Sequence, residues 1–338
     1  MSTENDEFRV AIDVMGGDHA PEVPVKGAIL AARNIGAKVF VVGDPDQVAA
    51  ELEKYDTSDL DLTLIPSEGY IKDAEAPATA LRQKPKASIL VATELVKRDM
   101  ADAVVSMGST GGSMAAAVVI LGTIHGIDRP AIGGPIVGSA PKQTILDLGS
   151  NIDCRASQLL GFGVLGSVFN KLLLNVENPR IGVLSVGSED GKGNALSKET
   201  SDLFKKSGLN FIGNIEGNDL VTGKADVVVC DGFVGNILLK LVEGLGQGLA
   251  KNLEGFLKDK IPSDQIVALI QRLYEENNVV DSRGGGPIFG VNGVSIIGHG
   301  SSSSETIERA VSLAKMCVET RLIQEMNNQV PLVMAKVT

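Results

Sequence analysis

The sequence predicts an α/β fold in which a mostly parallel β-sheet is covered by helices on both faces. Short runs rich in β-branched residues alternate along the chain with stretches of helical periodicity, as in repeated strand–helix units. Several of the strand-like runs end in a polar turn that contains glycine. Because ligands of open α/β sheets bind outside the carboxyl ends of the strands, we expect the functional site at these turns.

The amino-acid composition is that of a globular protein. The chain has 338 residues, 43% of them hydrophobic and 22% charged, so it can bury a large core and is too apolar to be disordered. Lysine and arginine number 31 against 42 acidic residues, which gives a net charge of -11. Proteins that bind nucleic acid nonspecifically usually carry the opposite sign, so we expect no nucleic-acid partner.

Several sequence features indicate the compartment in which the protein works. Residues 1–7 are polar and acidic, whereas a signal peptide begins with a basic stretch followed by an apolar one. The longest mostly apolar stretch, residues 114–124, is about half as long as a membrane-spanning helix. The three cysteines lie far apart, which argues against a disulfide framework and a zinc site. We therefore expect a cytoplasmic protein with reduced thiols and no metal.

The expected elements follow from the spacing of apolar residues. Short apolar runs predict strands at residues 8–14, 37–42, 61–65, 101–106, 144–148, 180–186 and 225–230. Apolar residues that recur every three to four positions predict helices at 23–34, 86–98, 113–121, 156–174, 197–206 and about 305–329. No solenoid repeat and no low-complexity linker divides the chain. We expect one α/β/α domain spanning residues 1–338.

One segment departs from the alternation of strands and helices. Between residues 233 and 278, two amphipathic helical stretches meet at Ile261-Pro262-Ser263-Asp264. A proline together with an N-cap residue predicts a helix–turn–helix corner there. We expect a protruding helical hairpin, inserted at about 245–280.

The turn after the first strand contains Asp13, Gly16, Gly17 and Asp18. Its glycines let the backbone approach a ligand or adopt a positive φ, and its acids, with His19, place titratable groups at the end of a strand. A polar turn that merely caps the next helix is the alternative.

A second turn, between a strand and an apolar helix, contains Ser109, Thr110 and Gly111. Small residues at a helix start expose backbone N–H groups at the positive end of the helix dipole, which suits phosphate or an oxyanion. A plain N-cap explains the same residues.

A third motif places Asp147, Asn151 and Asp153 at alternate positions of an extended segment, so that they point the same way. A magnesium site is conceivable, although the glycine and glutamate of an EF-hand are misplaced. A hydrogen-bonded polar row in a cleft is the favoured interpretation.

The remaining polar motifs also follow strands. Lys192 and Gly193 lie in a loop that misses the Walker A pattern by one spacer residue, which argues against nucleotide hydrolysis, although a lysine between glycines can bind an anion. A solvated turn lysine is the alternative. The other candidates share a place at a strand end or on the helix that follows: Asn214, Glu216, Gly217, Asp231, Gly232, Asn236 and Lys240. Asp231, with Asn236 and Lys240 one helical turn apart, predicts a functional polar cluster.

Two motif matches are set aside. The G-x-G-x-x-G sequence at residues 161–166 lies inside a helical pattern rather than between a strand and a helix, so it predicts close helix packing and not NAD binding. No serine sits in a G-x-S-x-G elbow, and a serine triad has no support. His299 is as consistent with a loop or capping residue as with a catalytic one.

Taken in one order, these motifs resemble the bacterial phosphate acyltransferases, the PlsX family, over residues from about 8 to 328. The resemblance implies a fold like that of isocitrate and isopropylmalate dehydrogenases, with a mixed sheet in three α/β/α layers, usually as a homodimer. It also implies transfer of a fatty acyl group from acyl carrier protein to inorganic phosphate, without a cofactor, which forms an acyl phosphate for phospholipid synthesis. Peripheral contact with the inner face of the membrane and with a downstream glycerol-3-phosphate acyltransferase are implied as well.

The chemistry assigns hypothetical roles to these residues. A phosphate oxygen must attack a thioester carbonyl, so the enzyme has to hold an anion and stabilise a developing oxyanion, and no acyl-enzyme is required. By hypothesis, Lys192 and the backbone N–H groups near residues 109–112 hold phosphate, and Asp231, Asn214 and Asn236 orient the reacting groups. Asp13, Asp18 and Glu216 would shape the cleft or relay protons.

Two departures from the family pattern affect these expectations. Where the family motif reads Gly-Asn-Thr-Gly, this chain has Ser109 in place of the asparagine. An amide contact at that position is therefore lost or replaced by a hydroxyl. The hairpin contains Lys258-Asp259-Lys260 and Glu275-Glu276, so its basic excess and its attraction to anionic lipid are weak. Alternative functions are a phosphotransacetylase-like enzyme that uses acyl-CoA, a dehydrogenase on the same fold, and a non-catalytic membrane scaffold for lipid enzymes.

Overall fold

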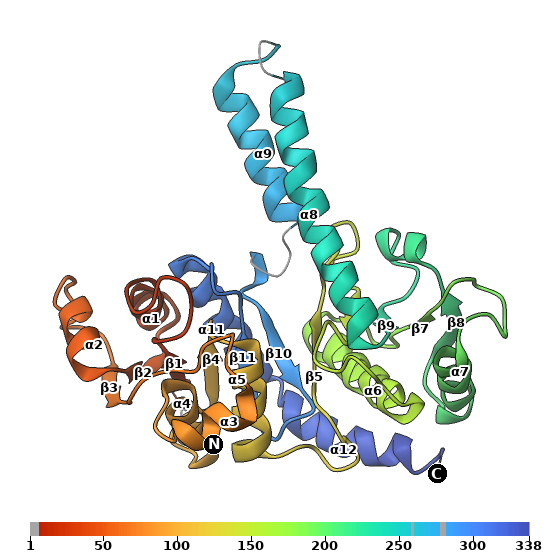
Figure 1. Cartoon of the computed structure of the whole chain (residues 1–338), viewed down its shortest axis with the longest axis horizontal. Helices are drawn as coiled ribbons and strands as arrows, with labels where there is room; N and C mark the ends of the chain where they lie inside the picture. Colours follow the sequence, from red (N-terminus) through yellow and green to blue (C-terminus); the bar gives the residue numbers. More distant parts are fainter. Residues whose placement is uncertain (1–6, 258–259, 278–281, 338) are drawn as a thin grey trace, which may run out of the picture. The chain divides into compact units, whose positions relative to one another are not determined.

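The computed structural model describes residues 7–257, 260–277 and 282–337, and the chain divides into two compact units (Figure 1). Unit 1 comprises Met1–Ile124 and Arg283–Gln324, and unit 2 comprises His125–Ser282 and Glu325–Thr338. That residues 1–338 act as one acyltransferase domain stays a prediction.

The sheet of unit 1 has the strand order β3-β2-β1-β4-β11-β10. All neighbours pair in parallel except β10, which is antiparallel to β11. The elements of this unit are β1 (Arg9–Asp13), α1 (Glu22–Ile35), β2 (Lys38–Gly43), α2 (Pro45–Leu52), β3 (Leu62–Pro66), α3 (Pro77–Gln83), α4 (Ser88–Lys97), β4 (Ala103–Ser106), α5 (Thr110–Ala116), a π-helical turn (Ala117–Leu121), β10 (Gly286–Phe289), β11 (Val294–Ile297) and α11 (Ser304–Glu319).

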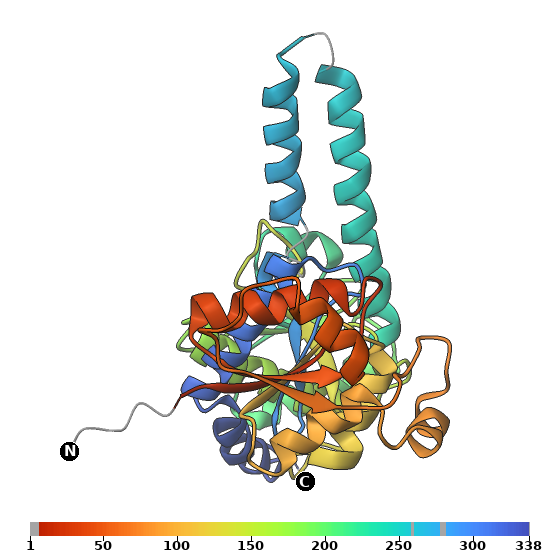
Figure 2. The same ribbon diagram turned by 90° about the vertical axis from the view of Figure 1, so that its left-hand side faces the viewer.

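Strand periodicity explains how this sheet buries both of its faces. Ala11, Phe40 and Val104 pack in one cluster with α4, and the alternate residues Val10 and Val39 are fully buried on the other face. Helices α1 and α11 pack together over that second face (Figure 2). Both faces of the sheet are therefore covered, as the alternating sequence pattern predicts.

The sheet of unit 2 has the order β5-β6-β9-β7-β8, and only β5 is antiparallel to its neighbour. Its elements are β5 (Ala131–Gly134), β6 (Thr144–Leu146), α6 (Ala156–Leu173), β7 (Ile181–Leu184), α7 (Ala195–Ser207), β8 (Phe211–Ile215), a 3-10 turn (Gly217–Val221), β9 (Val227–Val229), α8 (Gly232–Leu257) and α9 (Ser263–Asn277). Most of α12 (Leu322–Met334) also belongs to this unit.

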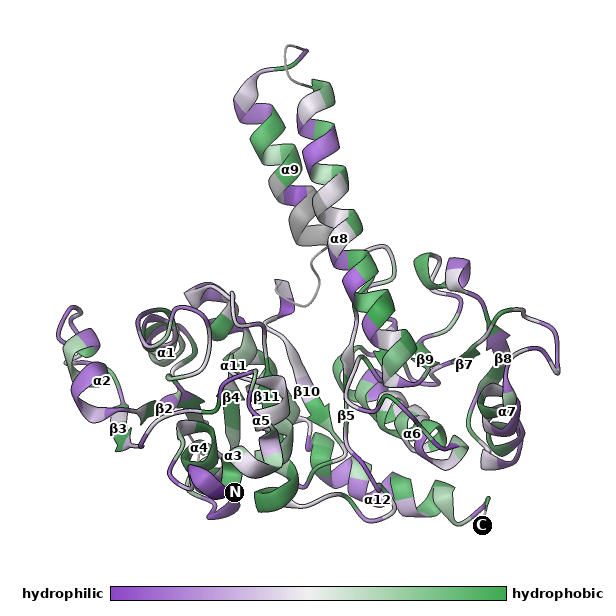
Figure 3. Cartoon of the chain, viewed as in Figure 1, coloured by the Kyte–Doolittle hydropathy of each residue, from purple (hydrophilic) through white to green (hydrophobic). Residues whose placement is uncertain are grey.

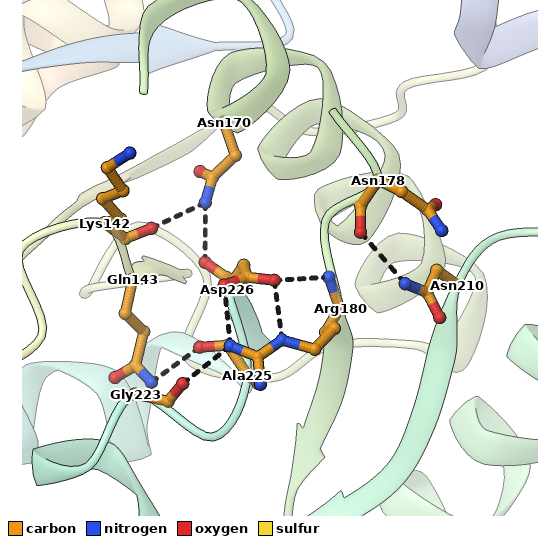
Figure 4. A network of polar contacts seen from close by, with 9 residues as sticks. All are labelled: Lys142, Gln143, Asn170, Asn178, Arg180, Asn210, Gly223, Ala225 and Asp226. Atoms are coloured by element: carbon orange, nitrogen blue, oxygen red, sulfur yellow. Dashed lines mark hydrogen bonds and ion pairs between the residues drawn. The ribbon is translucent and has the colours of Figure 1, made fainter. Parts of the chain in front are cut away.

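A polar network joins the amino-terminal ends of β6, β7 and β9 (Figure 4). The Arg180 guanidinium and its backbone N–H donate to the Asp226 carboxylate at 2.8 to 3.0 Å. The Asn170 amide, in α6, donates to the Asp226 and Lys142 carbonyls, both at 2.8 Å. The network adds side-chain donors and acceptors to main-chain groups at these strand ends.

Helices α8 and α9 form the predicted hairpin, which extends beyond the sheet of its own unit (Figure 1). Hydrophobic and hydrophilic residues alternate along both helices (Figure 3). Exposed apolar side chains follow one another every fourth residue on α8, at Ile237, Leu241, Leu245 and Leu249. Lys258 and Asp259, on which the expected weak basic excess of the hairpin rests, lie outside the described residues, as do the side chains of Glu275 and Glu276. Among the described helices, none is both long and apolar enough to cross a bilayer.

Several boundaries differ from those expected. The expected helix at 305–329 is interrupted, because Arg321 adopts a positive φ of 54° that ends α11 and lets α12 begin in a new direction. The expected helix at 113–121 begins three residues earlier, at Thr110, because Ser109 caps it. The G-x-G-x-x-G segment lies inside α6, where a Cβ on Gly163 would lie 2.4 Å from the Phe204 ring, so the prediction of close packing is confirmed.

Candidate functional site

The loops that follow β1, β4 and β11 of unit 1 meet at the carboxyl ends of these neighbouring strands. A Cβ atom on Gly16 would lie 2.7 Å from the Gly108 nitrogen, so two of the loops touch backbone to backbone. The third loop joins them through Gly300, whose carbonyl oxygen accepts the Asp18 N–H at 2.8 Å. Only glycine permits this approach at position 16.

Asp13, at the end of β1, anchors the two touching loops. Its carboxylate accepts hydrogen bonds from the Ser106 hydroxyl at 2.8 Å and from the Met15 N–H at 3.2 Å. The Ser106 hydroxyl in turn accepts the Gly108 N–H at 3.0 Å. Burial raises the pKa of Asp13 above its usual range, against the effect of these hydrogen bonds. Because Asp13 is 3% exposed, it positions the glycine loops and does not face solvent.

A cavity of about 320 Å³ opens in unit 1 where these loops meet. Residues of the glycine loops and of the segment before α3 line it: Gly16, Gly17, Asp18, Tyr70, Ile71, Lys72, Asp73, Met107, Gly108, Ser109, Thr110, Gly298, His299 and Gly300. The hydroxyl of Ser109 accepts the Gly112 N–H at 3.3 Å, so Ser109 caps α5 as well as lining the cavity. Gly111 packs instead against Pro77, where a Cβ would lie 2.8 Å from the proline ring.

The segment that brings Lys72 to this cavity is held by an ion pair. The Lys84 ammonium lies 2.7 Å from the Glu75 carboxylate and also donates to the Tyr70 carbonyl at 2.9 Å. Glu75 accepts the Lys72 N–H at 3.0 Å. The hydrogen bonds from Lys84 and from the Lys72 backbone lower the pKa of Glu75. These contacts fix the turn at residues 70–75 although it belongs to no strand or helix.

In unit 2, Asp147 organises the loop after β6. Its carboxylate accepts the N–H groups of Ser150 at 3.1 Å and of Asn151 at 2.6 Å, and also the Asn151 side-chain amide at 2.9 Å. The segment is therefore a tight turn and not extended, and the expectation that Asp147, Asn151 and Asp153 point the same way is wrong. Asp153 is exposed, whereas the other two are buried. The hydrogen-bonded interpretation holds for Asp147 and Asn151.

The start of α8 packs on this turn. The Gly232 N–H donates to the Asn151 carbonyl at 2.7 Å, and the Asp231 carboxylate accepts the Val234 N–H at 2.8 Å as a helix cap. The Asn236 side chain lies over Gly149, whose Cβ would be 3.3 Å from the amide oxygen. Asp231 and Asn236 thus flank one turn, whereas Lys240 is exposed and pairs with Glu243 at 2.8 Å.

Asn214, at the end of β8, orders the loop that carries Lys192. Its amide nitrogen donates to the Glu189 carbonyl at 3.1 Å and to the Lys192 carbonyl at 3.4 Å. Its oxygen accepts the Ser201 hydroxyl at 3.2 Å. Asn214 is 7% exposed, so it holds the main chain of a loop whose lysine side chain is exposed.

The remaining predicted residues of unit 2 lie in turns. Gly193 adopts a φ of +101°, and a Cβ there would lie 2.6 Å from the Ser185 hydroxyl oxygen. Glu216 caps the 3-10 turn that Gly217 begins, and its own backbone N–H donates to Asp219 at 3.0 Å.

The cysteines are poor nucleophiles. Burial, followed by the charge of Asp147, raises the pKa of the Cys154 thiol to about 11. Burial also raises the pKa of Cys230, which is almost fully enclosed. Because the thiolate is the reactive form, neither is set up for covalent catalysis at neutral pH. Within residues 7–257, 260–277 and 282–337, no group of His, Cys, Asp and Glu side chains could hold a metal ion.

Comparison with known proteins identifies the family. A sequence model described as "Fatty acid synthesis protein" matches residues 8–325. The chain belongs to this family. Curated members named phosphate acyltransferase include one from Nostoc sp., 42% identical over 332 residues and covering 95% of this chain and 96% of that protein. Another, from Pelotomaculum thermopropionicum, is 42% identical over 337 residues, covering 97% of each. The protein is therefore an acyltransferase, and the resemblance seen in the motifs is confirmed.

Solved structures of other proteins share the fold of this family member at low sequence identity. A phosphotransacetylase from Streptococcus pyogenes has a TM-score of 0.59 at 17% identity and covers 95% of each chain. A 4-hydroxythreonine-4-phosphate dehydrogenase from Klebsiella pneumoniae has a TM-score of 0.52 at 15% identity, covering 93% of this chain and 100% of that one. These likenesses confirm the predicted α/β/α class.

The predicted site residues of this acyltransferase lie in three places. Gly16, Gly17, Asp18, Ser109 and Thr110 line the cavity of unit 1. Asp231, Gly232 and Asn236 gather on the Asp147 turn of unit 2, and Lys192 lies on the separate loop ordered by Asn214. The sequence did not single out Tyr70, Lys72 or Asp73, because no strand ends directly before them and no glycine motif marks them.

Proposed function

We propose that this acyltransferase transfers a fatty acyl group from acyl carrier protein to inorganic phosphate and forms an acyl phosphate for phospholipid synthesis. The observation that carries the proposal is the 42% identity, over 95% of the chain, to a protein named phosphate acyltransferase. At this level of identity and coverage, a shared reaction is the expectation that best fits the family membership.

The geometry of the described residues supports this chemistry. Attack of a phosphate oxygen on a thioester carbonyl needs a held anion and donors for the developing oxyanion, and the departing thiolate needs no nucleophilic side chain. The glycine loops of unit 1 bring main-chain atoms to the wall of a polar cavity. The raised pKa of Cys154 agrees with direct transfer, without an acyl-cysteine intermediate.

The described contacts refine the roles proposed for the side chains. Lys192, Asp231 and Asn236 remain the proposed catalytic residues. Asp13, Asn151 and Asn214 are buried and hold backbone, so we assign them positioning roles. Asp153, Glu216, Gly217 and Lys240 stay candidates for substrate contact.

The proposal extends to partners and location. Acyl carrier protein is the acyl donor, and the enzyme works as a cytoplasmic homodimer in peripheral contact with the membrane, where a glycerol-3-phosphate acyltransferase would take up the product. The exposed Ile237, Leu241, Leu245 and Leu249 on α8 support an apolar contact of this kind.

The test is incubation of the purified protein with palmitoyl-acyl carrier protein and phosphate, with hydroxylamine to trap the acyl phosphate and a count of released thiol. Phosphate-dependent thiol release with trapped product supports the proposal. Release from acetyl-CoA in preference to the carrier protein would replace it with a phosphotransacetylase-like activity. No release from any donor would refute an acyl transfer to phosphate.

Within this assay, Lys192→Ala tests the anion-binding role of the lysine. We expect the KM for phosphate to rise about tenfold or more, as for loss of a charged hydrogen bond. Lys198→Ala, which removes an exposed lysine from α7, is the matched control. An unchanged dependence on phosphate in the Lys192 variant would remove that residue from the role.

A further inference from the structure

Lys72 lines the cavity of unit 1, and its ammonium group has no carboxylate partner among the described residues. Other lysines nearby are paired: Lys84 lies 2.7 Å from Glu75, and Lys86 lies 2.6 Å from Glu68. The Lys72 ammonium lies 5.9 Å from the centre of the Tyr70 ring, and no carboxylate of the described residues is within ion-pair distance of it. Glu75 and Lys84 fix the backbone of this loop, so Lys72 is anchored at the cavity wall and its exposed side chain can reach a ligand there.

His299 supplies a second donor to the same cavity. The Ser301 N–H donates to Nδ1 of His299 at 3.3 Å, and the Ser301 hydroxyl lies 2.8 Å from the same atom. Since Nδ1 accepts the backbone hydrogen, the neutral ring carries its hydrogen on Nε2. No described residue accepts a hydrogen bond from Nε2, so this N–H is free for a ligand.

Asp18 supplies an acceptor at the same wall. Its backbone N–H is fixed on the Gly300 carbonyl at 2.8 Å, and a carboxylate oxygen lies 2.8 Å from where a Cβ of Gly300 would be. In the described part of the chain its carboxylate has no hydrogen-bond or ion-pair partner. Asp73, a second carboxylate, also lines the cavity.

This combination of donors and carboxylates discriminates among anions. A fully deprotonated anion such as sulfate gains from Lys72 and His299 but is repelled by the carboxylates, which only accept hydrogen bonds. Inorganic phosphate keeps at least one P–OH group at neutral pH and can donate it to a carboxylate. A phosphodiester, as in the prosthetic arm of a carrier protein, has no such hydrogen.

We infer that the cavity of unit 1 binds inorganic phosphate and selects it over sulfate, with Lys72 and His299 as donors and Asp18 as the acceptor of the phosphate proton. The inference rests on the proposed function, in which phosphate is the acyl acceptor. It adds residues outside the Lys192 loop to the recognition of that substrate, and the anion-binding role proposed for Lys192 is kept.

The test measures binding of inorganic phosphate to the full-length protein without any acyl donor, by phosphorus NMR titration with sulfate as competitor. Lys72→Met should weaken phosphate binding about tenfold, and Asp18→Asn should lower the preference for phosphate over sulfate by about the same factor. His299→Gln keeps an N–H near the position of Nε2 and should bind phosphate more tightly than His299→Ala. The controls Lys86→Met and Asp59→Asn remove exposed charges outside the cavity lining.

The outcomes separate this inference from the proposed function. Unaltered phosphate binding in both Lys72→Met and Asp18→Asn, or equal affinity of the unmodified protein for sulfate and phosphate, would overturn the inference. A loss of phosphate binding in Lys192→Ala, combined with unaltered binding in the Lys72, Asp18 and His299 variants, would also overturn it. If the expected binding pattern is found but no acyl group is transferred, the proposed function fails and the phosphate site stands.

Discussion

Gly235 in helix α8 lies so close to Asp147 that a Cβ atom at position 235 would be 1.8 Å from the Asp147 carbonyl oxygen. This contact seats the first turn of α8 on the loop after β6. It is what brings Asp231, which caps the helix, and Asn236, in its first turns, to the turn that the Asp147 carboxylate organises.

Replacing Gly235 with alanine should therefore destabilise the protein. No flexible side chain can move aside, because the obstacle is backbone, so we expect a loss of at least about 2 kcal/mol in the free energy of unfolding. Chemical denaturation measures it. Gly244→Ala on the same helix is the control: nothing lies within 4 Å of its Cβ position, so it should be neutral or stabilising by up to about 1 kcal/mol. Equal effects of the two variants would contradict the close contact.

The raised pKa of Asp13 predicts a pH-dependent stability. Because burial lifts the folded-state pKa above 3.8, the folded protein holds this proton more tightly than the unfolded chain. The associated stability is fully present below pH 3.8 and is lost as the pH rises through the folded-state pKa. Asp13→Asn should remove this loss, so that its stability relative to the unmodified protein improves with rising pH in thermal unfolding.

A second variant checks the same assignment in the opposite direction. The Ser106 hydroxyl donates to Asp13 and lowers its pKa. Ser106→Ala should extend the loss of stability to higher pH. The free energy of unfolding of the unmodified protein, of Asp13→Asn and of Ser106→Ala is compared over the pH range. If it depends on pH in the same way in all three, Asp13 does not titrate as described.

Cys154 should be dispensable for acyl transfer. With its pKa raised to about 11, the thiol is almost entirely protonated at neutral pH and should react slowly with iodoacetamide in the folded protein. We expect Cys154→Ser to keep its transfer rate within about twofold. An acyl group trapped on Cys154, together with inactivity of the variant, would disprove direct transfer.

Arg180 should stabilise unit 2 from the amino-terminal ends of its strands. Burial by itself would raise the pKa of Asp226. The hydrogen bonds and charge of Arg180 outweigh this effect, so the pKa of Asp226 lies below its usual value. Arg180→Met should cost about 1–2 kcal/mol near neutral pH, because the Asp226 carboxylate loses its side-chain donors. That difference should shrink as the pH falls and Asp226 takes up a proton.

An exposed ion pair provides the comparison for Arg180. Arg98 and Glu94 pair within α4 with side chains that are 70% and 42% exposed. Arg98→Met should cost only about 0.3–0.5 kcal/mol in the same unfolding assay. A cost for Arg180→Met as small as this would mean that the Asp226 network adds little.

The apolar runs of the sequence predicted β1, β2, β3, β4, β6, β7 and β9, and they missed β5, β8, β10 and β11. The run at 8–14 became β1, and the run at 37–42 became β2. Strands β5 and β8 contain glycines, and β10 begins with glycine and proline, which are residues that sequence patterns associate with turns. Their place is set by pairing with distant strands, information that local periodicity does not carry.

The candidate site likewise contains residues that the sequence predicted and residues that it missed. Glycine turns at strand ends, such as that of Gly16, are visible as motifs and do line a cavity. Lys72 could not be predicted from the sequence, because its place at the cavity wall depends on the ion pair between Lys84 and Glu75, which lie on either side of α3. The error at Asp153 arose because alternation was assumed for a segment whose backbone N–H groups turn inward to one carboxylate.

The position of β11 in the sheet of unit 1 bears on the order in which the protein can be completed during synthesis. β11 pairs with β4 in the interior of the sheet order, yet it is translated after every strand of unit 2. Until it emerges from the ribosome, β4 has an open edge and α1 lacks α11, the helix that packs against it. The unit that begins first on the ribosome is thus the one whose sheet closes last, and a nascent chain halted before residue 294 would expose an unpaired strand edge in unit 1 while all strands of unit 2 are already made.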